Sequence, residues 1–291
     1  MCRLYGLQAT HPSRAACELL DAQNALIQQS RTDARGLSNP HGWGMGHVAN
    51  GTTACFRQVE PASESAEYRK KALLTAGTTV LAHVRRATIG DPKHPNTHPF
   101  RRGSSLLIHN GHVPAFDRVR PHLLDRLDEE RRQSIRGSTD SEHLFVLLLQ
   151  LREEQPDAPL HTITREAVSL VQDWVQDEAP HATVEAVDAD TSTLGHDALE
   201  DLLGLNLLWT DGDTLSGARL NRTLWALERD HVHMCPLYDE DDVDLLDDKP
   251  YHSTTLASER LTDENWQEVP NGSVFQAGDT GALHLEALQG P

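Results

Sequence analysis

Short apolar and β-branched segments that end at turn residues are the feature that most constrains how this chain can fold. They occur in clusters, and segments with helical spacing separate some of the clusters. Short runs of this composition are typical of strands. Strand clusters with helices between them predict an α+β architecture of layered antiparallel sheets. The strands are expected at residues 4–8, 42–48, 53–59, 78–83, 104–109, 206–210, 215–219, 254–257 and 272–276.

Helices are expected where apolar residues recur at helical spacing. Ser13 to Ser30 has such a stripe, with Ser13 as its N-cap. Residues 140–151 follow a cap at Ser138 or Thr139, and the same spacing recurs over residues 113–127 and 163–175. The pairs Asn50-Gly51 and Asp211-Gly212 predict hairpin turns between neighbouring strands.

Two acidic segments are expected to lie at the surface. Residues 183–200 are polar and predict a loop or an insertion, and residues 239–248 contain seven acidic side chains in ten. A calcium site is the alternative for the second segment, but its spacing is not that of an EF-hand loop. A solvated surface loop is therefore the favoured interpretation of both segments.

Length and charge narrow the class of protein. The 291 residues suffice to bury a core without disulfides or metals, and they fit one large domain or two small ones. The net charge of −18 disfavours binding to nucleic acid or to an anionic membrane. With 22 Arg but 4 Lys, the acid-rich composition also suggests adaptation to high salt.

The N-terminus and the cysteines indicate a cytoplasmic protein. No apolar stretch after the start resembles a secretory signal, and no run approaches the length of a membrane span. The four cysteines are too few and too scattered for a disulfide framework or a CxxC zinc site. The histidine pairs His94/His98 and His231/His233 form no consistent ligand cluster, so we expect no metal and no cofactor.

Cys2 is the residue best suited to act as a nucleophile. A small side chain after Met1 favours removal of the initiator methionine, which would leave Cys2 with a free α-amine. Such an amine ordinarily has a pKa of about 7.7–8.0, so part of it is neutral near pH 7 and can accept a proton. One residue would then supply both nucleophile and base. The alternative is a small buried residue that happens to follow Met1.

Polar groups follow several of the expected strands. Arg85 and Thr88 come just after one strand, Asn110 and Gly111 end another, and Asp140 lies at the first turn of a helix. Each also has a purely structural interpretation. Arg85 would form an ion pair, Asn110-Gly111 would be only a turn, and Asp140 would be a helix cap or first-turn acid.

Taken together, these motifs resemble the class II glutamine amidotransferases, whose nucleophile is an N-terminal cysteine. Their order along the chain is Met-Cys-Arg, Gly-Trp-Gly, Ala-His-Val-Arg-x-Ala-Thr, Asn-Thr-His-Pro-Phe, His-Asn-Gly and Ser-Thr-Asp-Ser-Glu. The motifs lie within residues 1–150, and a weaker resemblance continues through residues 206–219 and 257–274. The chain is most similar to the stand-alone members, which are YafJ-like or resemble the ergothioneine-pathway γ-glutamyl hydrolase.

The resemblance implies a fold and a catalytic set. The fold is the four-layer αββα sandwich of the N-terminal nucleophile hydrolases, with residues 1–291 as a single domain. Cys2 would attack a γ-glutamyl amide and form a thioester, with its α-amine as the general base. Asn110, through its side-chain amide, and Gly111, through its backbone N–H, would stabilise the oxyanion. Glycine at that position would also let the backbone approach the substrate.

The resemblance also implies how the glutamyl group is held. Arg85 would bind the α-carboxylate with its planar fork, Thr88 would add a hydroxyl donor, and Asp140 would pair with the α-ammonium. Arg86 and Ile89 stand where ammonia-channelling members tend to carry Trp and His. No synthase domain is recognised after the motifs, so the second half is expected to complete the fold.

Three functions are therefore compatible with these motifs. The first is hydrolysis of a γ-glutamyl amide bond in a small molecule. The second is a glutaminase subunit that delivers ammonia to a separate synthase partner, and the third is a non-catalytic γ-glutamyl-binding regulatory protein. The intact set of motif residues favours the enzymes, and a homodimer is a further possible assembly. The sequence does not identify the leaving amine.

Overall fold

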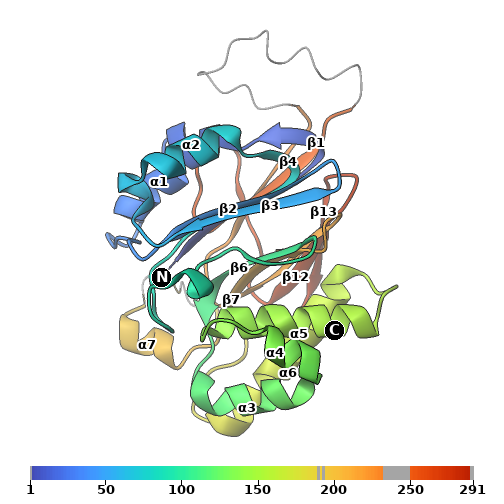
Figure 1. Ribbon diagram of the computed structural model, residues 1–291. Helices are drawn as coiled ribbons and strands as arrows, with labels where there is room; N and C mark the ends of the chain where they lie inside the picture. Colours follow the sequence, from blue (N-terminus) through green and yellow to red (C-terminus); the bar gives the residue numbers. More distant parts are fainter. Residues whose placement is uncertain (1, 189–190, 192–193, 232–249, 289–291) are drawn as a thin grey trace.

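The computed structural model describes residues 2–188, 191, 194–231 and 250–288, and in them two antiparallel β-sheets lie face to face (Figure 1). The first sheet has the strand order β11-β9-β10-β1-β4-β2-β3. Its strands are β1 (Arg3–Arg14), β2 (Trp43–Ala49), β3 (Thr52–Gln58), β4 (Ala76–Val84), β9 (Trp225–Arg229), β10 (Ser253–Ala257) and β11 (Gln267–Glu268). The second sheet has the order β13-β12-β8-β7-β6-β5. Its strands are β5 (Phe100–Arg102), β6 (Ser105–His112), β7 (Gly204–Thr210), β8 (Leu215–Leu220), β12 (Ser273–Ala277) and β13 (Leu283–Ala287).

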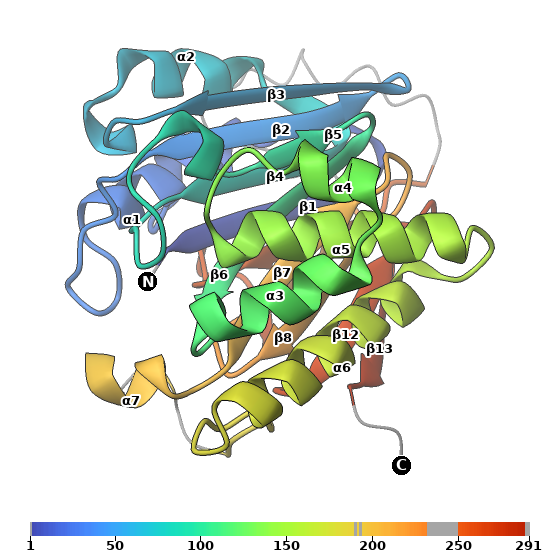
Figure 2. The same cartoon turned by 60° about the horizontal axis from the view of Figure 1, so that its bottom comes forward.

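Helices cover the outer face of each sheet (Figures 1 and 2). The first sheet is covered by the π-turn η1 (Cys17–Asp21), by α1 (Leu26–Arg31), by the 3-10 turn η2 (Ala62–Glu64) and by α2 (Ala66–Leu74). The second is covered by α3 (Phe116–Arg126), α4 (Glu129–Ser134), α5 (Asp140–Glu154) and α6 (Leu160–Glu178). The 3-10 turn η3 (His94–Asn96) and the short helix α7 (His196–Glu200) lie in connections. This confirms the predicted α+β fold, a four-layer αββα sandwich.

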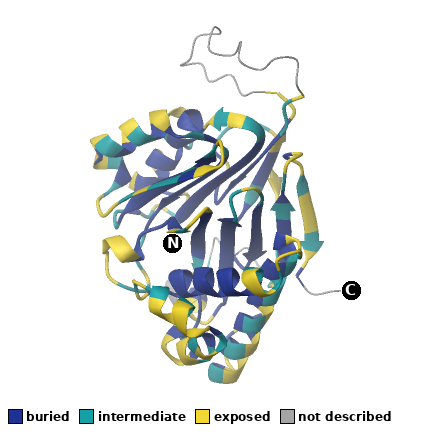
Figure 3. Ribbon diagram, turned by 45° about the vertical axis from the view of Figure 1, so that its right-hand side comes forward, coloured by how far each residue is buried: buried dark blue, intermediate teal, exposed yellow. Residues whose placement is uncertain are grey.

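Strand alternation explains why four layers form. Successive side chains of a strand point to opposite faces of its sheet. On β1, Leu4 packs between the sheets, whereas Tyr5 and Leu7 pack under the helices of the first sheet. On β6, Leu106 and Ile108 face the space between the sheets, and Leu107 faces the helices of the second sheet. Three buried clusters result, one for each contact between layers, and Figure 3 shows the sheets as the most buried part.

The helix predicted over residues 13–30 is wrong. Strand β1 continues to Arg14, because Ser13 and Arg14 pair with Gly77 and Ala76 of β4 after an irregularity in register. The chain then forms only the short turn η1 and the six-residue helix α1, with extended backbone at Ala22 and Ala25. The apolar residues that suggested one helix, Leu19 and Leu26 among them, are nevertheless buried against the first sheet.

Most other predicted elements are confirmed, with ends shifted by a few residues. The Asn50-Gly51 turn has positive φ at both residues, 50° and 69°, and Thr139 caps α5 by accepting a hydrogen bond from the Glu142 N–H. Helix α2 was missed because only Tyr68 and Ala72 of its residues are buried.

The two acidic segments have different outcomes. Residues 183–200 form an irregular segment over their described part, and α7 occupies its end. The acidic segment 239–248 lies outside the described residues, as does His233. No helix in the described part of the chain is both long and apolar enough to cross a lipid bilayer.

Candidate active site

Cys2 lies at the start of β1, next to the end of β4. Antiparallel pairing places Arg3 opposite Val84, so Cys2 is adjacent to the residues that follow β4. The Cys2 thiol donates a hydrogen bond to the Arg86 carbonyl, and its sulfur accepts one from the Arg86 N–H, both at 3.3 Å. The residue is partly exposed and its thiol is not in a disulfide. The sulfur is therefore held in a defined place that solutes can still reach, so the alternative of a merely buried small residue is not supported.

Arg3 fixes the backbone that carries the thiol. Its buried guanidinium forms ion pairs with Asp33 (Nη2 to Oδ2, 2.8 Å) and Glu259 (Nε to Oε1, 2.5 Å). It also donates from Nη1 to the Cys2 carbonyl at 2.9 Å. Sequence reasoning missed this network, because the two acids lie far from Arg3 along the chain. Arg3 thus anchors the N-terminal end of the chain next to the candidate nucleophile.

Asn110 reaches the same end of the molecule from the second sheet. Its Nδ2 donates to the Ser258 hydroxyl at 3.1 Å, and that hydroxyl also accepts from the Leu4 N–H at 3.1 Å. Ser258 therefore connects the Asn110 side chain to the strand that begins beside Cys2. This leaves Nδ2 with a second N–H to donate. Ser258 was not predicted, since nothing in its local sequence marks it.

Asn110 and Gly111 lie within β6, which runs on to His112, so the alternative of a simple turn at this pair is wrong. Gly111 pairs with Leu205 of β7. A Cβ at Gly111 would lie only 1.9 Å from the Gly204 carbonyl oxygen and 2.2 Å from the His109 ring. The close approach that requires glycine in the described structure is thus that of the β7 backbone and the His109 ring to Gly111.

Arg85 is buried and organises the loop that follows it. Its Nη1 donates to the Asp91 carbonyl at 3.1 Å, and its Nη2 donates to the carbonyls of Ile89 (3.0 Å) and Gly90 (2.9 Å). Among the described residues no carboxylate lies within ion-pair distance of it, so the predicted structural ion pair is not found. Burial lowers the pKa of Arg85, while the nearby Cys2 and Asp140 raise it. The guanidinium is therefore hydrogen-bonded to backbone carbonyls and has no carboxylate partner among the described residues.

Asp140 is the first residue of α5 and is buried. Its Oδ2 accepts from the Val113 N–H at 3.1 Å, and its Oδ1 accepts from the Ser141 N–H (2.7 Å) and hydroxyl (3.1 Å). These donors hold both carboxylate oxygens in place at the N-terminus of α5. Asp140 is therefore a first-turn acid of α5, as its structural interpretation predicts. Its carboxylate lies against Val113, the residue that follows β6.

The Arg85 loop carries Thr88, whose side chain is exposed. Asn96 connects this loop to the start of α5. Its Nδ2 donates to the Asp91 carbonyl at 3.0 Å, and its Oδ1 accepts from the Ser138 N–H at 2.9 Å. The Asn-Thr-His-Pro-Phe motif thus positions a loop through Asn96, which sequence reasoning did not assign.

Three buried histidines lie behind these groups. The rings of His83 and His98 are 4.2 Å apart, and His83 Nε2 is 3.1 Å from the His109 carbonyl oxygen. Burial lowers the pKa of all three, that of His83 to about 3. They are therefore neutral at pH 7 and pack as uncharged rings.

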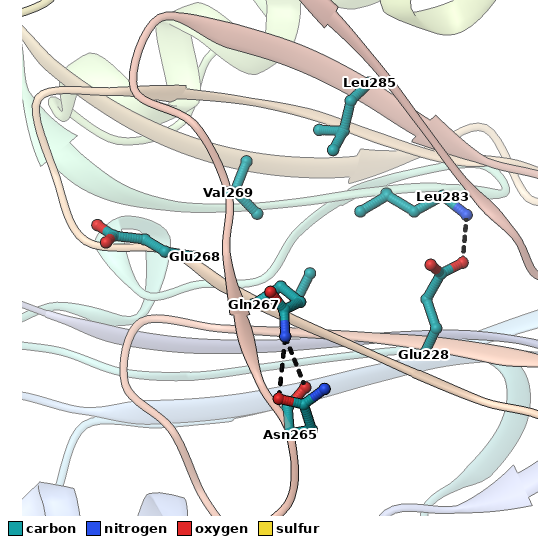
Figure 4. Close-up of a pocket in the computed structure, with 8 residues that line it drawn as sticks. Glu228, Asn265, Gln267, Glu268, Val269, Leu283 and Leu285 are labelled. Carbon is teal, nitrogen blue, oxygen red and sulfur yellow. Dashed lines mark hydrogen bonds between the residues drawn. The ribbon is translucent and has the colours of Figure 1, made fainter.

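A cavity of about 350 Å³ lies elsewhere, where the edges of the two sheets meet (Figure 4). Its walls include Glu228 of β9, Gln267 of β11, Leu283 of β13, and Val269, which directly follows β11. Glu228 accepts a hydrogen bond from the Leu283 N–H at 3.0 Å across it. None of the predicted site residues lines this cavity, so it is separate from the candidate active site.

Comparisons with known proteins agree with this arrangement. A family model described as class-II glutamine amidotransferases matches residues 1–289. The chain is 27% identical to the probable glutamine amidotransferase DUG3 of Saccharomyces cerevisiae, over 75% of this chain and 63% of that protein. It is 37% identical to the gamma-glutamyl-hercynylcysteine sulfoxide hydrolase of Mycolicibacterium smegmatis, over 35% of this chain and 47% of that protein. The matches thus span less than two thirds of either relative.

A solved structure shows the same fold over the whole length. It is that of a glutamine aminotransferase class-II domain protein from Silicibacter pomeroyi. The two chains superpose with a TM-score of 0.61 at 19% identity, over 98% of this chain and 99% of that one. The four-layer sandwich, the N-terminal cysteine and the family match over nearly every residue lead to one conclusion. The chain belongs to the class-II glutamine amidotransferases.

Proposed function

We propose that the protein hydrolyses the γ-glutamyl amide bond of a small molecule through a thioester on Cys2. The observation that carries the proposal is the free Cys2 thiol, which the Arg86 backbone holds beside the start of β1, while Asn110 is hydrogen-bonded to the same strand through Ser258. The names of the two relatives, an amidotransferase and a γ-glutamyl hydrolase, support the same substrate class. The cytoplasm is the proposed compartment.

The reaction begins once Met1 is removed and Cys2 carries a free α-amine. The neutral amine takes the thiol proton, and the thiolate attacks the amide carbonyl carbon. The amine then gives its proton to the leaving nitrogen as the C–N bond breaks, which releases the amine product and leaves a glutamyl thioester. A water molecule, deprotonated by the same α-amine, hydrolyses the thioester to glutamate and restores the thiol.

The oxyanion formed in each attack needs hydrogen-bond donors. The Asn110 amide retains one N–H beyond its bond to Ser258, and the Gly111 backbone N–H is the proposed second donor. Fixed donors of this kind act best when they need not reorganise during the reaction. The link through Ser258 to β1 would hold the amide in place for this purpose.

Substrate recognition is assigned to the two buried charges and the loop between them. Arg85, which has no carboxylate partner among the described residues, would bind the α-carboxylate. The Asp140 carboxylate would bind the α-ammonium, and the exposed Thr88 hydroxyl would add a donor at the loop. Buried charges left unpaired penalise ligands without a matching charge, so the glutamyl head would be selected over other acyl groups.

The central experiment incubates the purified full chain with glutamine and a panel of γ-glutamyl amides and identifies the released glutamate and amine. Cys2→Ala should abolish release. Cys55→Ser is the matched control and should retain activity, because burial raises the pKa of the Cys55 thiol and it lies outside the site. Glutamate release that persists in Cys2→Ala would refute the proposal. Ammonia release from glutamine alone, and only with a partner protein, would favour the synthase-linked alternative.

Two further variants separate chemistry from binding. Asn110→Ala should lower kcat by about 10²–10³ with little change in KM, because one oxyanion donor is lost. Arg85→Lys keeps the charge but loses the planar fork, so it should chiefly raise KM. An unchanged kcat in Asn110→Ala would remove this residue from the oxyanion role. Mass spectrometry of active protein should show loss of Met1, and full activity with Met1 retained would contradict the α-amine as base.

A further inference from the structure

A second cluster of chemically reactive side chains lies on the outer side of the second sheet. His161 of α6 meets His284 and Glu286 of β13, and one nitrogen or oxygen of each lies within 4.8 Å of the others. His161 Nε2 is 3.2 Å from Glu286 Oε1, and His284 Nε2 is 2.9 Å from the same oxygen. The two rings therefore converge on a single carboxylate oxygen.

Neighbouring groups orient this cluster. Gln276 Oε1 lies 2.8 Å from His161 Nδ1 and can only accept, so Nδ1 carries the hydrogen. In the neutral ring, Nε2 then presents its lone pair to Glu286 Oε1. Arg165 donates to the other carboxylate oxygen, Oε2, which leaves Oε1 facing the imidazoles. A histidine ligand whose other nitrogen donates to a fixed acceptor is the usual second shell of a metal site.

A cation must lie between His161 Nε2 and the carboxylate: either a proton on this nitrogen, which would make an ion pair, or a metal ion shared with His284. Without one, the lone pairs of His161 Nε2 and Glu286 Oε1 would face each other at 3.2 Å. In a tetrahedral zinc site with bonds of about 2.0–2.2 Å, neighbouring ligand atoms are about 3.3 Å apart. The two distances to Glu286 Oε1, 3.2 and 2.9 Å, are already close to that spacing.

We propose that His161, His284 and Glu286 bind a zinc-type divalent transition metal. Two imidazoles and a carboxylate suit zinc and its neighbours in the first transition series, and they disfavour magnesium and calcium, which prefer oxygen ligands. The His284 side chain is 58% exposed, so water can complete the coordination. The ligand set is of the three-protein-ligand type that keeps one open position.

The cluster differs from the other histidine–carboxylate pairs of the described chain. His122 with Glu178, and His181 with Asp201, each join one imidazole to one carboxylate. Within the described residues, only His161, His284 and Glu286 bring three possible ligands together. Figure 2 shows α6 and β13 on the side of the C-terminus, away from the N-terminus that carries the candidate nucleophile. The proposed metal therefore has no part in the proposed hydrolysis.

The position suggests what the metal does. β13 is an edge strand that pairs only with β12 in its sheet. A metal shared by His161 on α6 and two residues of β13 would cross-link this edge strand to the helix layer. Binding to the folded state alone raises stability by mass action. The metal would thus stabilise the fold, although an open coordination position is more usual in catalytic zinc sites.

The test uses the full chain, stripped of metal with a chelator that is then removed, and titrated with zinc chloride by calorimetry and thermal melting. We expect one site, and a rise in Tm of roughly 5–10 °C at a free zinc concentration 100 times Kd. His284→Ala and Glu286→Gln should each weaken binding at least tenfold and remove the rise in Tm. His122→Ala is the matched control, since it removes a histidine paired with one carboxylate, and it should bind as the unaltered chain does.

Cobalt separates this site from the cysteines. Bound Co²⁺ should give a spectrum of nitrogen and oxygen ligands, and a thiolate-to-cobalt charge-transfer band would place the metal on a cysteine and overturn the proposal. It is also overturned if zinc shows no saturable binding, if magnesium gives the same rise in Tm, or if both Glu286→Gln and His284→Ala bind zinc with unchanged affinity. Circular dichroism and the metal-free Tm establish that each variant is folded before its affinity is compared.

Discussion

The buried guanidinium of Arg222 destabilises the folded state, and replacing it should stabilise the protein. It is 2% exposed, and no carboxylate of the described residues pairs with it. Its Nη1 donates to the Asn221 carbonyl at 2.6 Å, while its Nε is buried without a partner. Burial lowers its pKa from 12.5 to about 10, and the nearby charge of Arg35 contributes in the same direction.

The cost follows from that pKa. A change from 12.5 to about 10 corresponds to roughly 3 kcal/mol of unfavourable free energy for the charged form at pH 7. Arg222→Met removes the charge and keeps an apolar side chain that adapts to the space. It also leaves the Asn221 carbonyl without this donor, which costs about 1 kcal/mol. The net gain is therefore about 2 kcal/mol, or a rise in Tm of roughly 4–8 °C.

Arg219→Met provides the matched control, because its guanidinium is fully used. Arg219 donates to the Arg222 carbonyl at 2.7 Å, to the Val269 carbonyl and to Glu268 Oε1 at 2.6 Å. Its removal should lower the Tm, since buried acceptors lose their donors. The assay is thermal melting by circular dichroism, with urea unfolding as a second measure. If Arg222→Met lowers the Tm as Arg219→Met does, the inferred cost of the buried charge is refuted.

Three further outcomes test the packing and charge of the molecule. Gly111→Ala should lower the Tm far more than Gly51→Ala, because a Cβ at Gly111 meets the Gly204 oxygen at 1.9 Å whereas Gly51 faces open space; equal losses would contradict this. Urea unfolding should show that the free energy of unfolding is full above about pH 6.5 and falls as the pH drops toward 3. The reason is that His83, with a pKa of about 3, takes up its proton only on unfolding, and each neutral buried histidine then lowers the stability by about 1.4 kcal/mol per pH unit. A flat profile would contradict the neutral state of these histidines. The Tm should rise by several degrees from 0.01 M to 1 M KCl, because the net charge of −18 repels itself less as the screening length falls from about 30 to about 3 Å. A Tm that stays flat or falls would show that this charge has no role in salt tolerance.

The sequence by itself determined most of the strands and several turns, although β5, β9, β11 and β13 were not predicted. Three features are local properties, set by residues close together in the chain: the alternation of β1 and β6 side chains between the two faces of a sheet, the positive φ at Asn50 and Gly51, and the Thr139 cap. The motif residues likewise indicated the family before any contact was known, because residue types in a fixed order carry that information.

Only the tertiary structure decided which distant residues meet. Residues 13–30 have helical spacing, yet the pairing of Ser13 and Arg14 with β4 extends β1 into the segment, since strand partners outweigh a local preference. Ser258 reaches Asn110 from a position 148 residues further along the chain, and Gln276 lies 115 residues beyond His161. Such contacts leave no periodic trace in the sequence. They arise when the sheets and helices pack, and the packing brings these groups within hydrogen-bond distance.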